Sequence, residues 1–164
     1  SDQFEARTVR KTYWAVVEGR VSPDCGTWTD HLRKIPDAAQ VEVVAPDHPA
    51  GRIAVLHYRV LAVGEHCSWL EIDLETGRMH QIRVQAASRS HPILGDSQYG
   101  AMLPFGPATD DFRRRWIALH ARSLEFLHPM TRQLVSQTAP LPSAWQQLPT
   151  LSQGGGLPTT FFGG

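Results

Sequence analysis

The chain has 164 residues, and its 16 basic and 16 acidic side chains give a formal net charge of zero. Balanced charge excludes a basic surface over the whole molecule, so any site for a polyanion must be local. Two cysteines without a CxxC pair, and no apolar run as long as a membrane span, predict a cytoplasmic protein without a disulfide framework or a membrane helix.

Seven segments have the composition or the alternating pattern of β-strands. In chain order they are residues 11–17, 27–32, 41–44, 52–63, 69–74, 119–127 and 134–139. The fourth and fifth segments are joined by a short Gly-containing turn, and the last two by a short turn that begins at His128 and Pro129, which predicts two antiparallel hairpins.

Between the two hairpins, residues 78–89 have the period of a helix, with Thr76 as the expected N-cap and Gly77 as the turn out of the preceding strand. Gln81 and Gln85 are expected to point away from the core. The stripe that would face the core consists of Met79, Ile82, Arg83 and Ala86.

An arginine in an apolar stripe needs an explanation, because a guanidinium cannot lose its charge. Arg83 is either buried against a carboxylate or carbonyl groups, or it extends its head into water while its stem covers the core. The helical pattern alone leaves both alternatives open.

The C-terminal part of the chain is predicted to hold little regular structure. Ser143 is a candidate cap for a short helix that reaches Leu148, and residues 150–164 are rich in glycine and carry no charge. We therefore predict one domain over residues 1–149 and a flexible tail over residues 150–164. The domain is expected to be α+β, with a mixed, mostly antiparallel sheet and few helices, so that one sheet face is poorly covered.

Common catalytic and cofactor motifs are not present in the sequence. The eight histidines form no HxxxH or HExxH pattern, and the chain has no GxSxG elbow and no GxxxxGK loop. We therefore expect neither a metal site nor a cofactor.

Basic residues gather in three short segments, and such clusters suit phosphate oxygens, although most charge clusters are simply solvated. Three aromatic residues lie near them, and rings of this kind stack on unpaired bases. The clusters are Arg7, Arg10 and Lys11; Arg78, Arg83 and Arg89; and Arg113, Arg114 and Arg115, and the aromatic residues are Tyr13, Trp14 and Trp116.

The segments Leu74–Arg83 and His91–Asp96, followed by Tyr99 and Gly100, closely resemble the helix-and-loop signature of RNA pseudouridine synthases of the RluA type. The resemblance extends from about residue 3 to residue 145. It includes the segment from Phe4 to Gly19 and, in the last hairpin, Leu119–Ala121, His128–Pro129 and Ala139–Pro142.

The resemblance implies the fold of the C-terminal half of the family's catalytic domain. It also implies an isomerase that converts uridine in rRNA or tRNA to pseudouridine without a cofactor. Tyr13 matches the tyrosine that lies against the flipped base, and Arg83 matches the arginine that pairs with the catalytic aspartate. The residues that we expect to contact RNA are Arg7, Lys11, Arg78, His80, Arg113, Arg114 and Arg115.

One family motif has no counterpart in this sequence. The catalytic aspartate of the family belongs to an HRLD-type motif upstream of the tyrosine, but only twelve residues precede Tyr13. Asp2 lacks the surrounding motif, and Asp96 is expected to be structural. The sequence therefore predicts that the partner of Arg83 lies outside this chain and that the chain alone is inactive.

Two hypotheses follow. In the first, the chain is the C-terminal portion of a pseudouridine synthase whose N-terminal half is a separate or missing segment and a partner of this one. In the second, it is a non-catalytic RNA-binding relic of that family.

Overall fold

The structure is a computed structural model that describes residues 9–111, 115–147 and 152–153. Its strands form one sheet in the order β3-β2-β4-β5-β1-β6-β7, and β8 pairs with β4. All the pairs between these strands are antiparallel. The predicted α+β class with a mostly antiparallel sheet and few helices is confirmed.

Strands β1 to β7 lie where the sequence predicts them, and their ends differ from the predicted ends by at most two residues, whereas β8 was not predicted. The elements are β1 (Val9–Glu18), β2 (Cys25–Lys34), β3 (Val41–Val44), β4 (Arg52–Val63), β5 (Cys67–Leu74), α2 (Gln81–Ser88), η1 (Ser97–Tyr99), β6 (Leu119–Leu127), β7 (Leu134–Thr138), η3 (Ser143–Gln147) and β8 (Ser152–Gln153). Both predicted hairpins, β4–β5 and β6–β7, are present.

Helix α2 begins three residues later than predicted. His80 precedes it in the left-handed region with φ 52°, so the first turn cannot start at residue 78. Thr76 is not the N-cap. Its hydroxyl accepts a hydrogen bond from the backbone N–H of Val55 and donates one to the side chain of Gln81. Met79 lies outside the helix and is 43% exposed, so it is not part of the core stripe.

The orientation predicted for the two helix glutamines is wrong, because both side chains are buried. Gln81 donates to the carbonyl of Val55 and accepts from the N–H of Arg78. Gln85 donates to Asp30 and to the carbonyl of Trp28. These hydrogen bonds satisfy both amide groups of Gln81 and the NH2 group of Gln85, which would otherwise be costly to bury, whereas Oε1 of Gln85 has no hydrogen-bond partner among the described residues.

The centre of the sheet is buried on both faces. Helix α2 covers one face, where Ile82 and Ala86 join the main core. On the other face, Trp69 of β5 is fully buried, and its ring lies 5.2 Å from that of Trp145 in η3. The face that we expected to be poorly covered is therefore closed at its centre by a short 3-10 helix.

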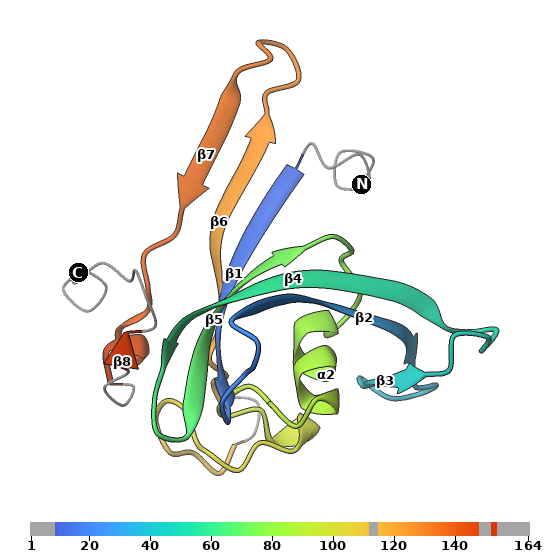
Figure 1. Ribbon diagram of the computed structural model, residues 1–164, viewed down its shortest axis with the longest axis vertical. Coiled ribbons are helices and arrows are strands. Elements are labelled where there is room, and N and C mark those ends of the chain that lie inside the picture. Colours follow the sequence, from blue (N-terminus) through green and yellow to red (C-terminus); the bar gives the residue numbers. More distant parts are fainter. Residues whose placement is uncertain (1–8, 112–114, 148–151, 154–164) are drawn as a thin grey trace.

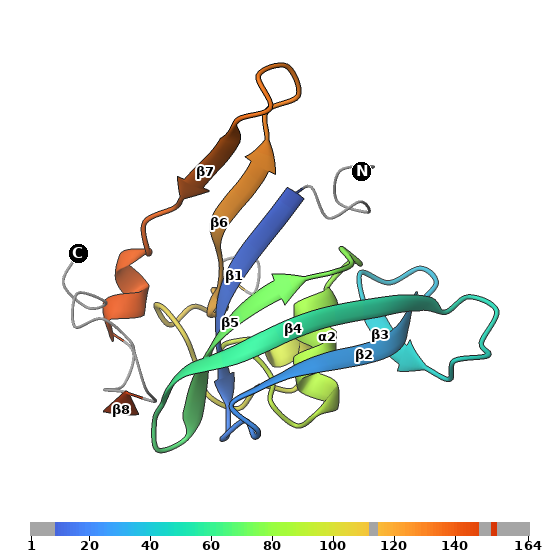
Figure 2. The ribbon, with the colours of Figure 1, turned by 45° about the horizontal axis from the view of Figure 1, so that its top comes forward.

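Strands β6 and β7, together with the first half of β1, project away from the rest of the molecule (Figure 1, Figure 2). We call β6, β7 and Val9–Tyr13 of β1 the arm. Most side chains of β6 are half-buried and those of β7 are mostly exposed. The arm is thus the part of the sheet that the described residues cover least.

The predicted tail at residues 150–164 lies outside the described residues, except for Ser152–Gln153, which pair with β4. The predicted short helix after Ser143 is present as η3, whereas Leu148 is also outside the described part. Within the described ranges, no helix is long and apolar enough to cross a membrane.

Candidate active site

Arg83 on α2 makes a two-point ion pair with Asp96, which lies just before η1. Nε and Nη2 of Arg83 donate to the two carboxylate oxygens of Asp96 at 2.8 and 2.7 Å, and Nη2 also donates to the side chain of Gln98. The side chain of Arg83 is 17% exposed and that of Asp96 is 1% exposed. The hydrogen bonds from Arg83 to Asp96 raise the pKa of Arg83 above its ordinary value, although burial opposes this.

This geometry decides between the two alternatives for Arg83, because the side chain is half-buried and its guanidinium is paired with a carboxylate. The sequence predicted that the carboxylate paired with Arg83 lies outside this chain. In the structure, Arg83 instead pairs with Asp96 of the same chain, so that prediction is wrong for this ion pair. Asp96 behaves as the structural residue that we predicted. Among the described residues, none accepts a hydrogen bond from Nη1 of Arg83, so one edge of the guanidinium can still donate.

Tyr99 forms an aromatic wall beside this ion pair. The guanidinium carbon of Arg83 lies 4.9 Å from the centre of the Tyr99 ring. The Tyr99 hydroxyl accepts from the N–H of Val41 and lies 2.7 Å from Nδ1 of His80. Burial raises the pKa of Tyr99, so the ring remains neutral at ordinary pH. Strand β3, the start of α2 and Arg83 are thereby held in one arrangement.

His80 should make the stability of the fold depend on pH. Burial, followed by the nearby charge of Arg83, lowers the pKa of His80. The unfolded chain, in which histidine has a pKa of about 6.5, therefore binds the proton at a higher pH than the folded chain. This contribution to stability is complete above about pH 6.5 and is lost as the pH falls through the lowered folded value.

We expect the free energy of unfolding to decline less between about pH 7 and about pH 5 in His80→Asn than in the wild type. Asparagine tolerates the left-handed backbone at this position. Urea unfolding across this pH range measures the difference, with His66→Asn as the control, since the side chain of His66 is 73% exposed. Parallel curves for His80→Asn and the wild type would contradict the expectation.

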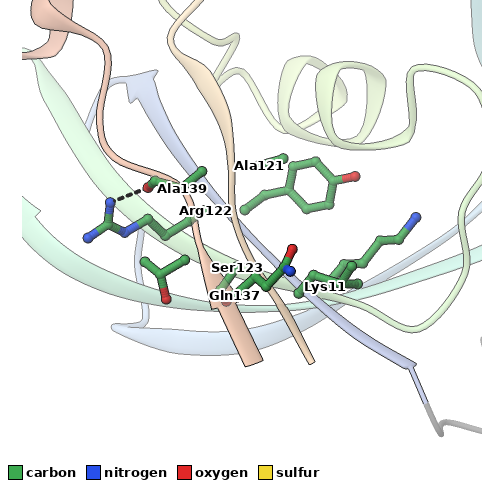
Figure 3. A pocket seen from close by; sticks show the side chains of 9 residues that line it. Lys11, Ala121, Arg122, Ser123, Gln137 and Ala139 are labelled. Carbon is green, nitrogen blue, oxygen red and sulfur yellow. Dashed lines mark hydrogen bonds between the residues drawn. The ribbon is translucent and has the colours of Figure 1, made fainter. Parts of the chain in front are cut away.

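Tyr13 lies elsewhere, on β1, opposite Ile72 of β5 and Ala121 of β6. It lines a cavity of about 330 Å³ at the base of the arm. We call this the arm cavity; its lining residues are Lys11, Tyr13, Ala121, Arg122, Ser123, Leu124, Gln137, Thr138 and Ala139. Figure 3 shows Arg122 donating a hydrogen bond to the carbonyl of Ala139 on one side of this cavity and Lys11 on the other.

Arg122 is a basic residue of the arm cavity that the sequence patterns did not indicate. A bulge between Thr12 and Tyr13 shifts the register with β6, so that Ala121 and Ser123 pair with β1 while Arg122 between them does not. Its guanidinium carbon lies 4.3 Å from the centre of the Trp14 ring. No sequence pattern predicts a bulge, and Arg122 stands alone between polar and small residues, which is why it was missed.

The residues predicted to bind RNA are spread over the molecule. Lys11 lines the arm cavity. Exposed Arg78 donates to the carbonyl of Ile53 near the start of β4, and exposed Arg115 donates to Ser97. Arg7, Arg113 and Arg114 lie outside the described residues. Within the described part, no hydrogen bond or ring contact joins Tyr13 to Arg83, Asp96 or Tyr99. No group of three or more His, Cys, Asp or Glu residues in that part could hold a metal ion.

A match to a family model shows which protein family the chain belongs to. A model described as RNA pseudouridylate synthase matches residues 1–88, which include β1 to β5 and α2. The chain belongs to the RluA-type RNA pseudouridine synthase family.

Curated members of the family agree with this assignment. The chain is 36% identical over 151 residues to the uncharacterized RNA pseudouridine synthase YhcT of Bacillus subtilis, covering 89% of this chain and 45% of YhcT. It is 41% identical over 151 residues to ribosomal large subunit pseudouridine synthase D of Haemophilus influenzae, covering 88% of this chain and 45% of that protein. The chain therefore spans less than half the length of these relatives.

A solved structure of the family has the same fold. Human RNA Pseudouridylate Synthase Domain Containing 4 superposes with a TM-score of 0.66 at 23% identity, over 87% of this chain and 61% of that chain. The predicted likeness to a pseudouridine synthase catalytic domain is thereby supported at the level of the fold. The catalytic roles of Tyr13 and Arg83 stay predictions.

Proposed function

We propose that this chain is part of an enzyme that converts uridine to pseudouridine in RNA, in rRNA or tRNA, without a cofactor. Family membership supports the reaction, and relatives named as ribosomal large subunit pseudouridine synthases favour rRNA. In this isomerisation the bond between N1 and C1′ breaks and the uracil turns. A bond then forms between C5 and C1′, C5 loses its hydrogen, and N1 gains a proton.

The observation that carries the proposal is the position of Tyr13 in the arm cavity. A nucleobase must leave its stack to be rearranged, and it then needs a pocket with an aromatic wall. A volume of about 330 Å³ can accept a base, and Lys11 and Arg122 supply positive charge for the neighbouring phosphates. Tyr13 would contact the uracil and help to remove the C5 proton, while Gln137 offers an amide to the polar edge of the base.

We further propose that the nucleophilic carboxylate comes from outside these 164 residues, on an N-terminal segment that would be a partner of this chain. Asp96 is unsuited to attack a ribose because its side chain is 1% exposed and Arg83 binds both of its oxygens. The free edge of Arg83 at Nη1 would be available to receive the incoming carboxylate.

Release of tritium from RNA labelled at C5 of uridine tests the proposal. The 164-residue chain should release none, whereas a chain extended at its N-terminus by the family's HRLD segment should be active. In the extended chain, Tyr13→Phe should reduce kcat by about 10²-fold or more, because the general base is lost. Tyr58→Phe is the matched control, since that hydroxyl only donates to the carbonyl of Pro23 and does not line the arm cavity.

Turnover by the 164-residue chain alone would show that the carboxylate lies within it and would refute that part of the proposal. An extended chain that binds RNA but releases no tritium would instead identify a non-catalytic RNA-binding relic.

We also propose a cytoplasmic location, which suits the two free cysteines, exposed Cys25 and buried Cys67.

A further inference from the structure

A second cavity, of about 470 Å³, lies between η1 and the segment before β6. We call it the loop cavity; it is lined by Gly95, Ser97, residues 101–110, Arg115 and Trp116. None of these residues lines the arm cavity. The roles proposed above for Tyr13, Lys11 and Arg83 therefore leave the loop cavity without a function.

Trp116 is the main aromatic surface of the loop cavity. The residue is 45% exposed, which is unusual for one with so large an apolar area. A Cβ added at Gly106 would lie 3.1 Å from atoms of the Trp116 side chain, and one added at Gly95 would lie 2.3 Å from its carbonyl oxygen. Because they have no side chains, Gly106 can pack closely against the Trp116 side chain and Gly95 against its backbone. Trp116 nevertheless remains 45% exposed.

The loop of the cavity is held in place by a distant carboxylate. One oxygen of Glu18, at the end of β1, accepts hydrogen bonds from the backbone N–H groups of Met102 and Leu103 at 2.6 and 2.7 Å. The N–H of Gly95 donates to the carbonyl of Leu103. These bonds preform the cavity, so a ligand need not bear the full entropic cost of ordering it.

The charges in the loop cavity favour a nucleobase over a free phosphate. Arg115 is exposed and its Nη1 donates to Ser97 at 3.2 Å, but the lining also contains the carboxylate of Asp110. One cation and one anion beside an exposed indole do not make an anion site. They suit a neutral aromatic ligand that stacks on Trp116, with Arg115 close to its phosphate.

The loop cavity is also close to Tyr13 along the chain and the β1–β6 pairing. Ala121 pairs with Tyr13, and Trp116 precedes Ala121 by five residues, a distance of at most about 17 Å along an extended chain. We infer that the loop cavity binds an unpaired nucleobase of the RNA a few nucleotides away from the target uridine, stacked on Trp116. The inference rests on the proposed function, because it takes RNA as the ligand.

Fluorescence anisotropy with a short, unstructured, uridine-rich RNA tests this inference on the full 164-residue chain. Trp116→Ala should weaken binding about tenfold without changing the salt dependence, since stacking on one base is lost. Trp116→Phe should retain most of the affinity. Arg115→Ala should reduce the slope of log affinity against log salt by about one unit, because one phosphate contact is lost. Met130→Ala, at an 87% exposed residue of the β6–β7 turn, is the control and should bind like the wild type.

A photo-crosslink on the unaltered protein removes any dependence on the folding of variants. RNA carrying 5-iodouridine should crosslink at Trp116, as mapped by mass spectrometry. No crosslink at Trp116, no RNA binding by the wild type, or a Trp116→Ala variant within twofold of the wild type would each overturn the inference. An extended chain that depends on Trp116 for RNA binding but makes no pseudouridine would refute the proposed function and leave the loop cavity as a base site.

Discussion

Replacing Asp96 with alanine is expected to destabilise the fold by about 3 kcal/mol or more. The substitution leaves the Arg83 guanidinium in a site where its side chain is 17% exposed, without the carboxylate that now binds two of its nitrogens. Breaking a buried ion pair by removing one partner costs about 3–5 kcal/mol, because the remaining charge is desolvated and unpaired. Urea unfolding at neutral pH measures the loss as a lower midpoint with an unchanged slope.

Two further variants separate the ion pair from its surroundings. Gln98→Ala removes one exposed acceptor of Arg83 and an exposed hydrogen bond to the carbonyl of Ala39, and it should cost only about 1 kcal/mol. The double variant Arg83→Met with Asp96→Ala should be more stable than Asp96→Ala alone, because no buried charge then lacks a partner. A cost below about 1 kcal/mol for Asp96→Ala would mean that water reaches Arg83 and replaces the carboxylate.

Replacing Gly95 with alanine should be the most damaging of the glycine substitutions near the site. Gly95 has φ +84°, and an added Cβ would lie 2.3 Å from the carbonyl oxygen of Trp116, a backbone atom that cannot move without shifting the start of β6. Strain in the left-handed region costs about 1–2 kcal/mol, and the clash adds to it, so we expect a total loss of about 4 kcal/mol or more.

Gly100 is the matched control for this substitution. Its φ is +93°, but an added Cβ would meet no atom within 4 Å. Gly100→Ala should therefore show the conformational strain alone, about 1–2 kcal/mol. Thermal or urea unfolding of the two variants gives the difference between them, which isolates the clash with Trp116. Equal losses at both positions would show that the backbone around Trp116 yields.

The sheet could be predicted from the sequence because its strands alternate or carry β-branched residues, and alternation follows directly from the geometry of a strand. Helix α2 was harder to predict. Periodicity treats glutamine as a surface residue, whereas Gln81 and Gln85 are buried and hydrogen-bonded to backbone and side-chain groups from β2, β4 and the turn before the helix. Such bonds depend on tertiary contacts that no local pattern records.

The candidate site could be predicted only in part for the same reason. The apolar stripe correctly indicated that Arg83 needs a partner. Which residue becomes that partner depends on the course of the chain after α2, which no local pattern specifies. One signal was available: Asp96 is the first acidic residue after Arg83, and a Gly precedes it. The Gly95 backbone at φ +84° makes the turn that brings Asp96 to within 2.7 Å of the guanidinium.

The arm has a consequence for the behaviour of the chain in concentrated solution. Strand β7, Leu134–Thr138, pairs only with β6 among the described residues, so its outer edge presents backbone donors and acceptors without partners in the sheet. It carries no charged residue and no proline, and Leu134 is 67% exposed. Natural sheets usually protect such an edge against self-association. Two copies of the isolated chain would therefore be expected to aggregate first along β7, edge to edge.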